Sequence, residues 1–157
     1  MTTPSALALH ESAHAIVSFS FSSDIEIAVG PDTIEVLPQT PPTSAAQVID
    51  AGLAGPFSDL LNKIKSKDGN PLAFLTRVRA AREAIRFAGY EVALKSDTAV
   101  HDLELLGPML TQSVVEQSFE RVAITLEAKA DGWVSLAEKI DLMQDGERMI
   151  LSRSAVH

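Results

Sequence analysis

The sequence predicts a mainly α-helical domain with one small β-hairpin near residues 24–37. Apolar residues make up 46% of the 157 residues and recur at helical spacings of three and four along most of the chain. The alanine-rich composition, together with leucine, glutamate, lysine and arginine, favours helix. Only residues 24–37 change to a two-residue alternation of polar and apolar side chains, which is typical of strands. The length fits one domain over residues 1–157.

The first helix is predicted from a capping signal followed by helical spacing. Thr3 is a suitable N-cap, Pro4 fits the first turn, and the helical pattern continues to about Phe19. Two strands follow at 24–29 and 33–37, with a Gly-Pro-Asp turn between them. Further helices are expected over residues 45–63, 71–87, 96–106, 109–129 and 132–143, with a polar loop at 65–70 and a frayed end at 148–157.

Capping and breaking residues set the boundaries of these later helices. Ser44 or Thr43 can cap the helix that starts at residue 45, and Ser96 can cap the one that ends at residue 106. Gly89 should end the helix before it, and Gly107-Pro108 should break or kink the chain after it. Gly52 and Gly55 loosen the helix over 45–63, and we expect them to permit close helix packing rather than to bind phosphate.

The formal net charge of −8, from 21 acidic and 13 basic residues, opposes two classes of partner. Nucleic-acid backbones and anionic membrane surfaces both require clustered lysine and arginine, so we expect neither. The absence of cysteine excludes disulfides and thiolate metal sites and allows a reducing compartment. No segment resembles a signal peptide or reaches the roughly 18 apolar residues of a membrane span. We therefore expect a soluble, cytoplasmic protein, and the composition leaves a homo-oligomer open.

One motif on the first predicted helix carries metal chemistry: His10-Glu11-Ser12-Ala13-His14. Residues four apart share one face of a helix, so two imidazoles at this spacing can converge on one tetrahedral zinc ion. Glu11 leaves the helix about 100° away from His10, so its carboxylate can reach a water on the metal rather than the metal itself. Zinc lowers the pKa of such a water towards about 7, and Glu11 can accept the proton and pass it to a leaving amine.

The alternative interpretation of this motif is a pair of surface histidines around a solvated glutamate. The flanking residues argue against it, because they indicate a core helix on which two inward imidazoles need partners. These apolar neighbours are Leu7, Leu9, Ala13, Ala15, Ile16 and Val17.

A catalytic zinc site usually takes three protein ligands, and no suitable histidine or glutamate lies just downstream of His14. In the helix predicted at 96–106, Asp102 groups with the apolar residues Leu105, Leu106 and Met109. A carboxylate on an apolar face requires a cation. That cation is either the metal or an arginine such as Arg82 or Arg86, and the residues alone leave both open. His101, Asp97 and Glu104 fall on the more polar side of the same helix.

These motifs resemble the peptidase domain of the FtsH-type membrane AAA proteases. The family's His-Glu-Ala-Gly-His-Ala helix is similar to residues 10–15, and its short β-element to the hairpin at 24–37. A small-residue stretch of a later family helix is similar to residues 51–55. The family's Ala-x-Asn-Asp-Leu stretch, which holds its third zinc ligand, is similar to residues 99–103, and its closing helices to residues 119–146.

The resemblance implies a largely helical zincin with His10, His14 and Asp102 as zinc ligands and Glu11 as the general base. The expected activity is hydrolysis of peptide bonds in peptides or unfolded proteins. No part of the sequence resembles a nucleotide site, so this activity should need no ATP and should spare tightly folded substrates. A strand of the hairpin can also pair with an extended substrate, or it can serve structure alone.

Two other classes of function remain open from the sequence. The fold could retain zinc as a non-catalytic binding or regulatory module. Two departures from the family favour this: no ATPase module is present, and Pro56-Phe57 stands where the family usually has a glutamate after its small-residue stretch. Retention of Glu11 argues against that reading, because a purely structural site does not require the base. The protein could also be a helical interaction protein in which the motif is coincidental. Trp133 is interpreted as a core or subunit-contact residue rather than a substrate platform.

Overall fold

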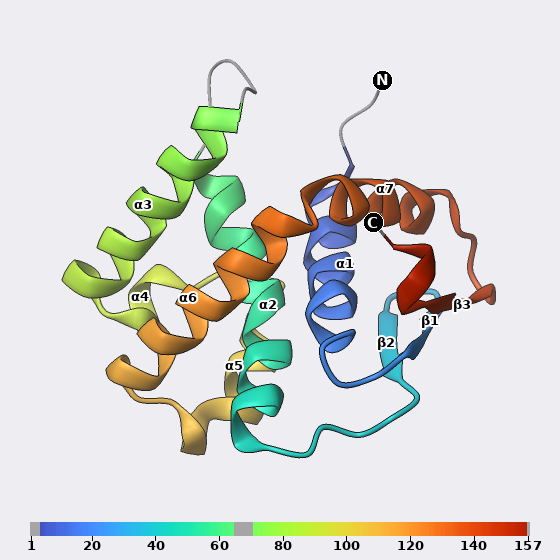
Figure 1. Cartoon of the computed structure of the whole chain (residues 1–157), viewed down its shortest axis with the longest axis horizontal. Helices are drawn as coiled ribbons and strands as arrows, with labels where there is room; N and C mark the ends of the chain where they lie inside the picture. The colour runs from blue at the N-terminus through green and yellow to red at the C-terminus, as the bar shows by residue number, and fades with distance from the viewer. Residues whose placement is uncertain (1–3, 65–70, 157) are drawn as a thin grey trace.

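The computed structural model describes residues 4–64 and 71–156, and helices dominate it (Figure 1), which confirms the predicted fold class. Three short strands form an antiparallel sheet beside them. Within the described ranges no helix combines the length and apolarity needed to cross a bilayer. In chain order the elements are α1 (Ala6–Ser18), β1 (Asp24–Val29), β2 (Ile34–Pro38), α2 (Ala45–Lys63), α3 (Pro71–Ala88), α4 (Tyr90–Ala93), α5 (Val100–Leu106), the 3-10 turn η1 (Gly107–Met109), α6 (Gln112–Ala128), α7 (Ala130–Leu142), β3 (Arg148–Ser152) and the 3-10 turn η2 (Arg153–Ala155).

The N-terminal cap of α1 is Ser5, not the predicted Thr3, which lies outside the described residues. The Ser5 hydroxyl accepts a hydrogen bond from the backbone N–H of Ala8 at 3.1 Å. It also donates to the carboxylate of Asp141 at 2.6 Å, so the start of α1 is tied to the end of α7. A serine cap satisfies one of the free N–H groups of the first turn, as the threonine cap would have done.

Helix α2 has the predicted bounds and the predicted Ser44 cap, whose side chain accepts from the backbone N–H of Gln47. It packs beside α1, and α6 crosses it on the face towards the viewer in Figure 1. The rings of Phe57 and Phe119 meet edge to face across the α2–α6 contact, with centroids 4.6 Å apart. The buried middle of α2 therefore joins the helices on both sides of it.

Trp133 lies in the core, as predicted. Its side chain is 5% exposed, and its indole N–H donates to the carbonyl of Leu9 at 2.9 Å. Since Leu9 directly precedes His10, this contact fixes α1 against α7 next to the motif. Leu7, on the first turn of the same helix, is 40% exposed and does not share that buried face.

The predicted hairpin is part of a three-stranded sheet in the order β2-β1-β3. Ile27 in the central strand pairs with Val36 on one side and with Met149 on the other. The expectation of a frayed end over 148–157 is wrong for the described residues of that segment. Two strands alone are marginally stable, and β3 completes the sheet by burying Leu151 and by pairing Arg148 with Glu26 at 3.0 Å.

Helix boundaries in the second half differ from the sequence prediction in several places, since α6 begins at Gln112 rather than at Met109 and α7 begins at Ala130 rather than at Gly132. The four-residue helix α4 was not predicted, and α5 begins at Val100 rather than at Ser96. Between them the chain makes a turn in which the Ser96 hydroxyl accepts from the backbone N–H of Ala99 at 3.2 Å. Gly89 ends α3 as predicted, with a φ of 84° that favours glycine. The predicted polar loop at 65–70 lies outside the described residues.

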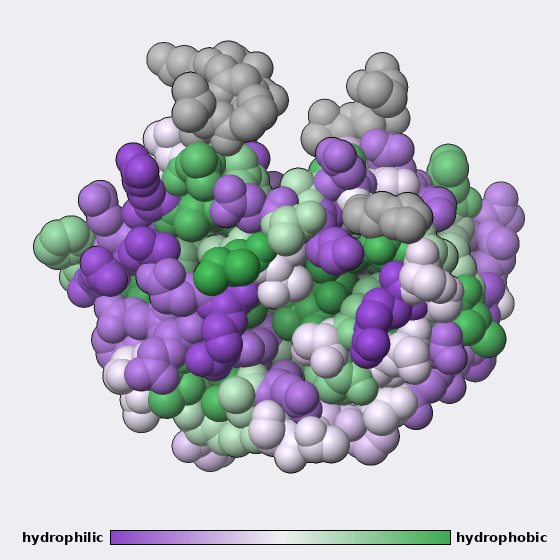
Figure 2. All heavy atoms as spheres, viewed as in Figure 1, coloured by the Kyte–Doolittle hydropathy of each residue, from purple (hydrophilic) through white to green (hydrophobic). Residues whose placement is uncertain are grey.

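The molecular face drawn in Figure 2 is a mosaic of hydrophilic and hydrophobic residues. Several large apolar side chains are exposed in the structure, among them Phe87 at 88%, Leu142 at 81% and Ile150 at 73%. They belong to α3, α7 and β3, so they come from separate elements. Individually exposed apolar side chains are ordinary in folded proteins and do not by themselves define a docking surface.

Candidate metal centre

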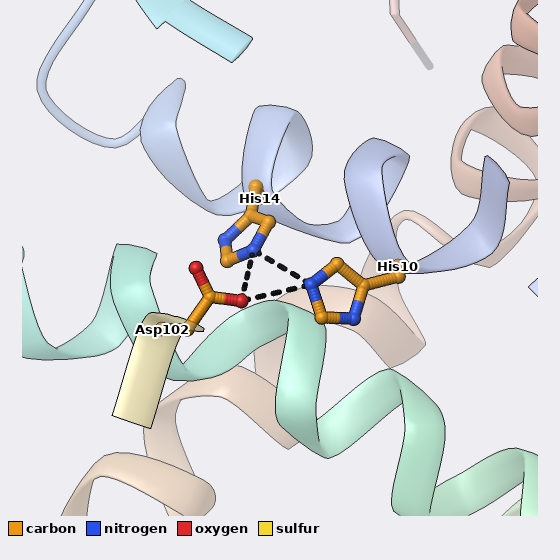
Figure 3. Close-up of side chains that lie close together, drawn as sticks. All are labelled: His10, His14 and Asp102. Atoms are coloured by element: carbon orange, nitrogen blue, oxygen red, sulfur yellow. Dashed lines mark hydrogen bonds and ion pairs between the residues drawn. The ribbon is translucent and has the colours of Figure 1, made fainter. Parts of the chain in front are cut away.

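Three side chains, two from α1 and one from α5, converge beside α2 (Figure 3). The Nε2 atoms of His10 and His14 lie 3.2 Å apart. Asp102 reaches them from α5, and its Oδ2 lies 2.8 Å from Nε2 of His10 and 3.2 Å from Nε2 of His14. The side chains are 2%, 13% and 19% exposed, in the order His10, His14 and Asp102. The sequence-predicted ligand set is therefore brought together at one point.

Asp102 does not form the ion pair with Arg82 or Arg86 that the sequence left open as an alternative. Arg82 contacts Glu120 at 2.8 Å, and Arg86 lies 3.7 Å from Glu116, whereas Asp102 contacts the two histidines. The buried face of α5 also differs from the predicted apolar stripe, because Leu105 is 66% exposed and Met109 is 38% exposed. The chain leaves the α-helix at Gly107, so the predicted i+7 position is no longer on the same face. The residues on the buried or half-buried face are Ala99, Asp102, Leu103 and Leu106.

Each histidine is oriented by a hydrogen bond from its other ring nitrogen. His14 Nδ1 donates to the carbonyl oxygen of Ala51 on α2 at 2.6 Å, and His10 Nδ1 donates to Oδ2 of Asp59 at 2.9 Å. A carbonyl and a carboxylate can only accept, so these contacts place a proton on Nδ1 of both rings. The Nε2 atoms are thereby directed at the shared centre, and such outer contacts are usual for histidines that bind metals.

Asp59 is a functional candidate that the sequence prediction missed. It is 7% exposed on α2, and besides His10 its Oδ2 accepts from the hydroxyls of Ser96 at 2.7 Å and Thr98 at 2.5 Å. One carboxylate oxygen therefore connects a ring on α1 to the turn that leads into α5. The available signal was an acidic residue within the apolar middle of a predicted helix, and a buried carboxylate of this kind requires partners.

Gly55 forms the floor of the site. A Cβ atom at this position would overlap Nε2 of His10 and Nε2 of His14. Only a residue without a side chain leaves room in front of the two nitrogens, so the close packing predicted for the α2 glycines is confirmed here. Gly55 therefore keeps open the space on which the three polar atoms converge.

The spacing of the three polar atoms suits a zinc ion. Two ligand atoms at about 2.0–2.1 Å from zinc and at the tetrahedral angle lie roughly 3.3–3.4 Å apart. The observed separations of 2.8–3.2 Å need outward shifts of a few tenths of an ångström to match. Two imidazole nitrogens and one carboxylate oxygen are also a donor set that zinc accepts. The residues present therefore fit the metal that the motif predicts.

Electrostatics in the cluster favour a cation at its centre. Burial alone lowers the pKa of His10, but hydrogen bonds to Asp102 and Asp59 outweigh it and raise that pKa to about 10. Burial raises the pKa of Asp102, and its contacts with His10 and His14 reverse that effect and leave the pKa well below its usual range. Without a metal, a proton on His10 therefore neutralises the ionised Asp102. A metal cation would take the place of that proton.

Glu11 lies beside this cluster on α1 and is half-buried. Burial raises the pKa of its carboxyl, and the nearby His14 and His10 act in the opposite direction. A carboxylate whose pKa is raised is a stronger base than a fully solvated one and therefore a better proton acceptor for catalysis. The four predicted site residues thus lie in one neighbourhood, while His101 and Glu104 are exposed on the other side of α5.

Comparison of the sequence with protein-family models and with characterised proteins finds no match. The fold and the site together define a mainly helical protein with a His-His-Asp candidate metal centre built on α1 and α5.

Substitutions of His101, Asp102 and Glu104 on α5 test which residue is the third ligand. We expect Asp102→Ala to weaken zinc binding by more than the roughly 10–100-fold that outer contacts cost, because it removes a donor atom. His101→Ala and Glu104→Ala should change zinc affinity by less than about threefold, because both side chains are exposed and outside the cluster. Competition titration with a chromogenic chelator measures all three. A larger loss for His101→Ala than for Asp102→Ala would mean that α5 has a different rotation.

Proposed function

We propose that the protein is a zinc-dependent peptidase that acts on peptides or unfolded proteins. His10, His14 and Asp102 would hold the metal, and Glu11 would act as the general base. The observation that carries this proposal is the convergence of the three polar atoms over the backbone of Gly55. The half-buried carboxylate of Glu11 directly follows His10 in the sequence. The resemblance of the motifs to the FtsH-type peptidase domain supports the same reaction.

A zinc ion bound by these residues would supply a Lewis acid that polarises the scissile carbonyl and lowers the pKa of a water molecule to about 7. Glu11 then accepts the proton of the attacking water and donates it to the leaving amine. Asp59 and the Ala51 carbonyl keep Nδ1 of each histidine protonated, so that both Nε2 atoms remain available as donors to the metal. The half-buried position of Glu11 keeps its carboxylate partly desolvated beside the reacting groups.

The ligand count favours catalysis over a purely structural role for the metal. Structural zinc sites are normally closed by four protein ligands, whereas catalytic sites use three and keep one position open. Among the residues that the structure describes, the candidate group contains three. Low exposure of the ligands favours the second candidate, a non-catalytic zinc module, since His10 is almost fully buried. The two functions share the metal and differ in whether Glu11 is used.

Metal removal tests the proposal. We expect the purified protein to cleave casein, to lose this activity on treatment with a zinc chelator, and to regain at least half of it when zinc is restored in slight excess. Addition of ATP should leave the rate unchanged. Cleavage is followed by the release of acid-soluble peptides. Activity that survives complete zinc removal would rule out the metal-dependent reaction, and zinc binding without any hydrolysis would favour the module.

A further inference from the structure

Asp102 is carried by a helix too short to hold its own position. Helix α5 has 7 residues, and isolated helices shorter than about 12–15 residues are marginal in water. Its polar and exposed side contributes no packing, since His101, Glu104 and Leu105 face solvent. The place of the Asp102 carboxylate relative to the histidines must therefore be set by contacts that α5 makes with the rest of the protein.

The contact before α5 is polar. Ser96 and Thr98, in the turn that leads into the helix, both donate to Asp59 on α2. This attachment fixes the start of the segment. A single attachment leaves a helix free to tilt, and Asp102 lies in the third position of α5, beyond this fixed point.

The contact at the far end of α5 is apolar and unusually close. Leu106 lies one turn after Asp102 on the same helix face and is 5% exposed. It rests against the backbone of α2 at Gly52, where an added Cβ would overlap the Leu106 Cδ1 and would lie 3.1 Å from its Cγ. Gly52 is three residues before Gly55. The glycine that Leu106 contacts and the glycine that the two histidines contact are therefore neighbours on the same face of α2.

We propose that Leu106 and Gly52 are positioning residues for the third metal ligand. The leucine side chain seated at the glycine sets the distance between α5 and α2, and that distance places the Asp102 carboxylate at His10 and His14. Together with the Asp59 attachment, the contact holds α5 at both ends. This inference rests on the proposed metal site and extends it to two residues whose side chains are not among the candidate ligands.

The test is a set of zinc affinities for Gly52→Ala in three backgrounds. In the otherwise unchanged protein, the added methyl group should force α5 away from α2 and weaken zinc binding about tenfold or more, the lower end for residues that orient ligands. With Leu106→Ala the obstructing side chain is gone, so Gly52→Ala should cost less than about threefold. In the Asp102→Ala variant, Gly52→Ala should also change the zinc affinity little, because Gly52→Ala acts through the position of Asp102.

Gly107→Ala is the matched control, because an added Cβ there meets no heavy atom within 4 Å. Substitution of cobalt for zinc gives a readout that packing alone would not move, since loss of the carboxylate alters the visible absorption bands of the ion. We expect the cobalt spectrum of Gly52→Ala to shift towards that of Asp102→Ala, while circular dichroism of the metal-free protein stays helical.

The outcomes separate this inference from the proposed function. Zinc binding by the unaltered protein together with an unchanged affinity in Gly52→Ala overturns the positioning role alone. Equal losses for Gly52→Ala in all three backgrounds overturn it as well, because they would show a general packing effect. Failure of the unaltered protein to bind zinc overturns both the proposed function and the inference. If Gly52→Ala does not fold, Leu106→Ala replaces it in the test. Leu106→Ala must then weaken zinc binding in the otherwise unaltered protein and leave the zinc affinity of the Asp102→Ala variant unchanged.

Discussion

Glu11→Gln should leave zinc binding unchanged and lower casein cleavage at least about a hundredfold. Glutamine keeps the size and polarity of the side chain but cannot accept a proton near neutral pH. General bases contribute about 10²–10⁴-fold to enzymatic rates, and a hundredfold loss corresponds to about 2.7 kcal/mol of transition-state stabilisation. Glu11 is half-buried next to His10 and His14 and belongs to none of the contacts among the three candidate ligands. Its loss should therefore affect the reaction and spare the metal.

Glu104→Gln is the matched control for this experiment. It makes the same chemical change on α5, at an exposed position close in sequence to Asp102, so it should retain full activity. Steady-state kinetics on a fluorogenic peptide, with zinc content measured on the same samples, separates the two effects. Cleavage by Glu11→Gln at the rate of the unaltered protein would assign the activity to another site or to a contaminating protease.

Gly55→Ala should abolish zinc binding although it adds only one methyl group. That methyl group would occupy the space in front of Nε2 of both His10 and His14, where the metal must lie. The imidazoles cannot simply turn aside, because their Nδ1 atoms are held by Asp59 and by the Ala51 carbonyl. Alanine is also the better helix former by about 0.8–1.0 kcal/mol, so the helix itself is not weakened.

We expect the zinc affinity of Gly55→Ala to fall by more than about a hundredfold, with cleavage lost in parallel. Gly107→Ala should bind zinc like the unaltered protein, because its new methyl group meets open space. Isothermal titration calorimetry measures both affinities, and circular dichroism checks that both variants remain helical. Stoichiometric, tight zinc binding by a folded Gly55→Ala would mean that the metal, if present, lies elsewhere.

Much of the candidate site could be predicted because it depends on spacing within single helices. Two histidines four residues apart share a helix face wherever the helix lies, so their pairing required no knowledge of the fold. Asp102 was predicted for a reason that was only partly right, since the stripe to which it was assigned included Leu105 and Met109, both exposed. The resemblance to a known family supplied the choice that the residues alone left open.

The remaining features depend on contacts between segments far apart in the sequence. Asp59 acquires its role from His10, 49 positions away, and from the turn at Ser96 and Thr98. Strand β3 pairs with β1 across more than a hundred residues, and its short sequence carries little strand signal of its own. Gly52 and Gly55 were predicted to permit close packing, but the sequence gives no indication of which side chains approach them.

The metal content of the purified protein tests the central claim most directly. Elemental analysis after dialysis against trace zinc should give close to one zinc ion per chain. His14→Ala removes one of the two paired imidazoles and should lose most of this metal, whereas His101→Ala, at an exposed position, should keep it. An unaltered protein that carries no zinc after this treatment, or a His14→Ala variant that retains a full equivalent, would contradict the assignment of His10, His14 and Asp102 as a metal centre.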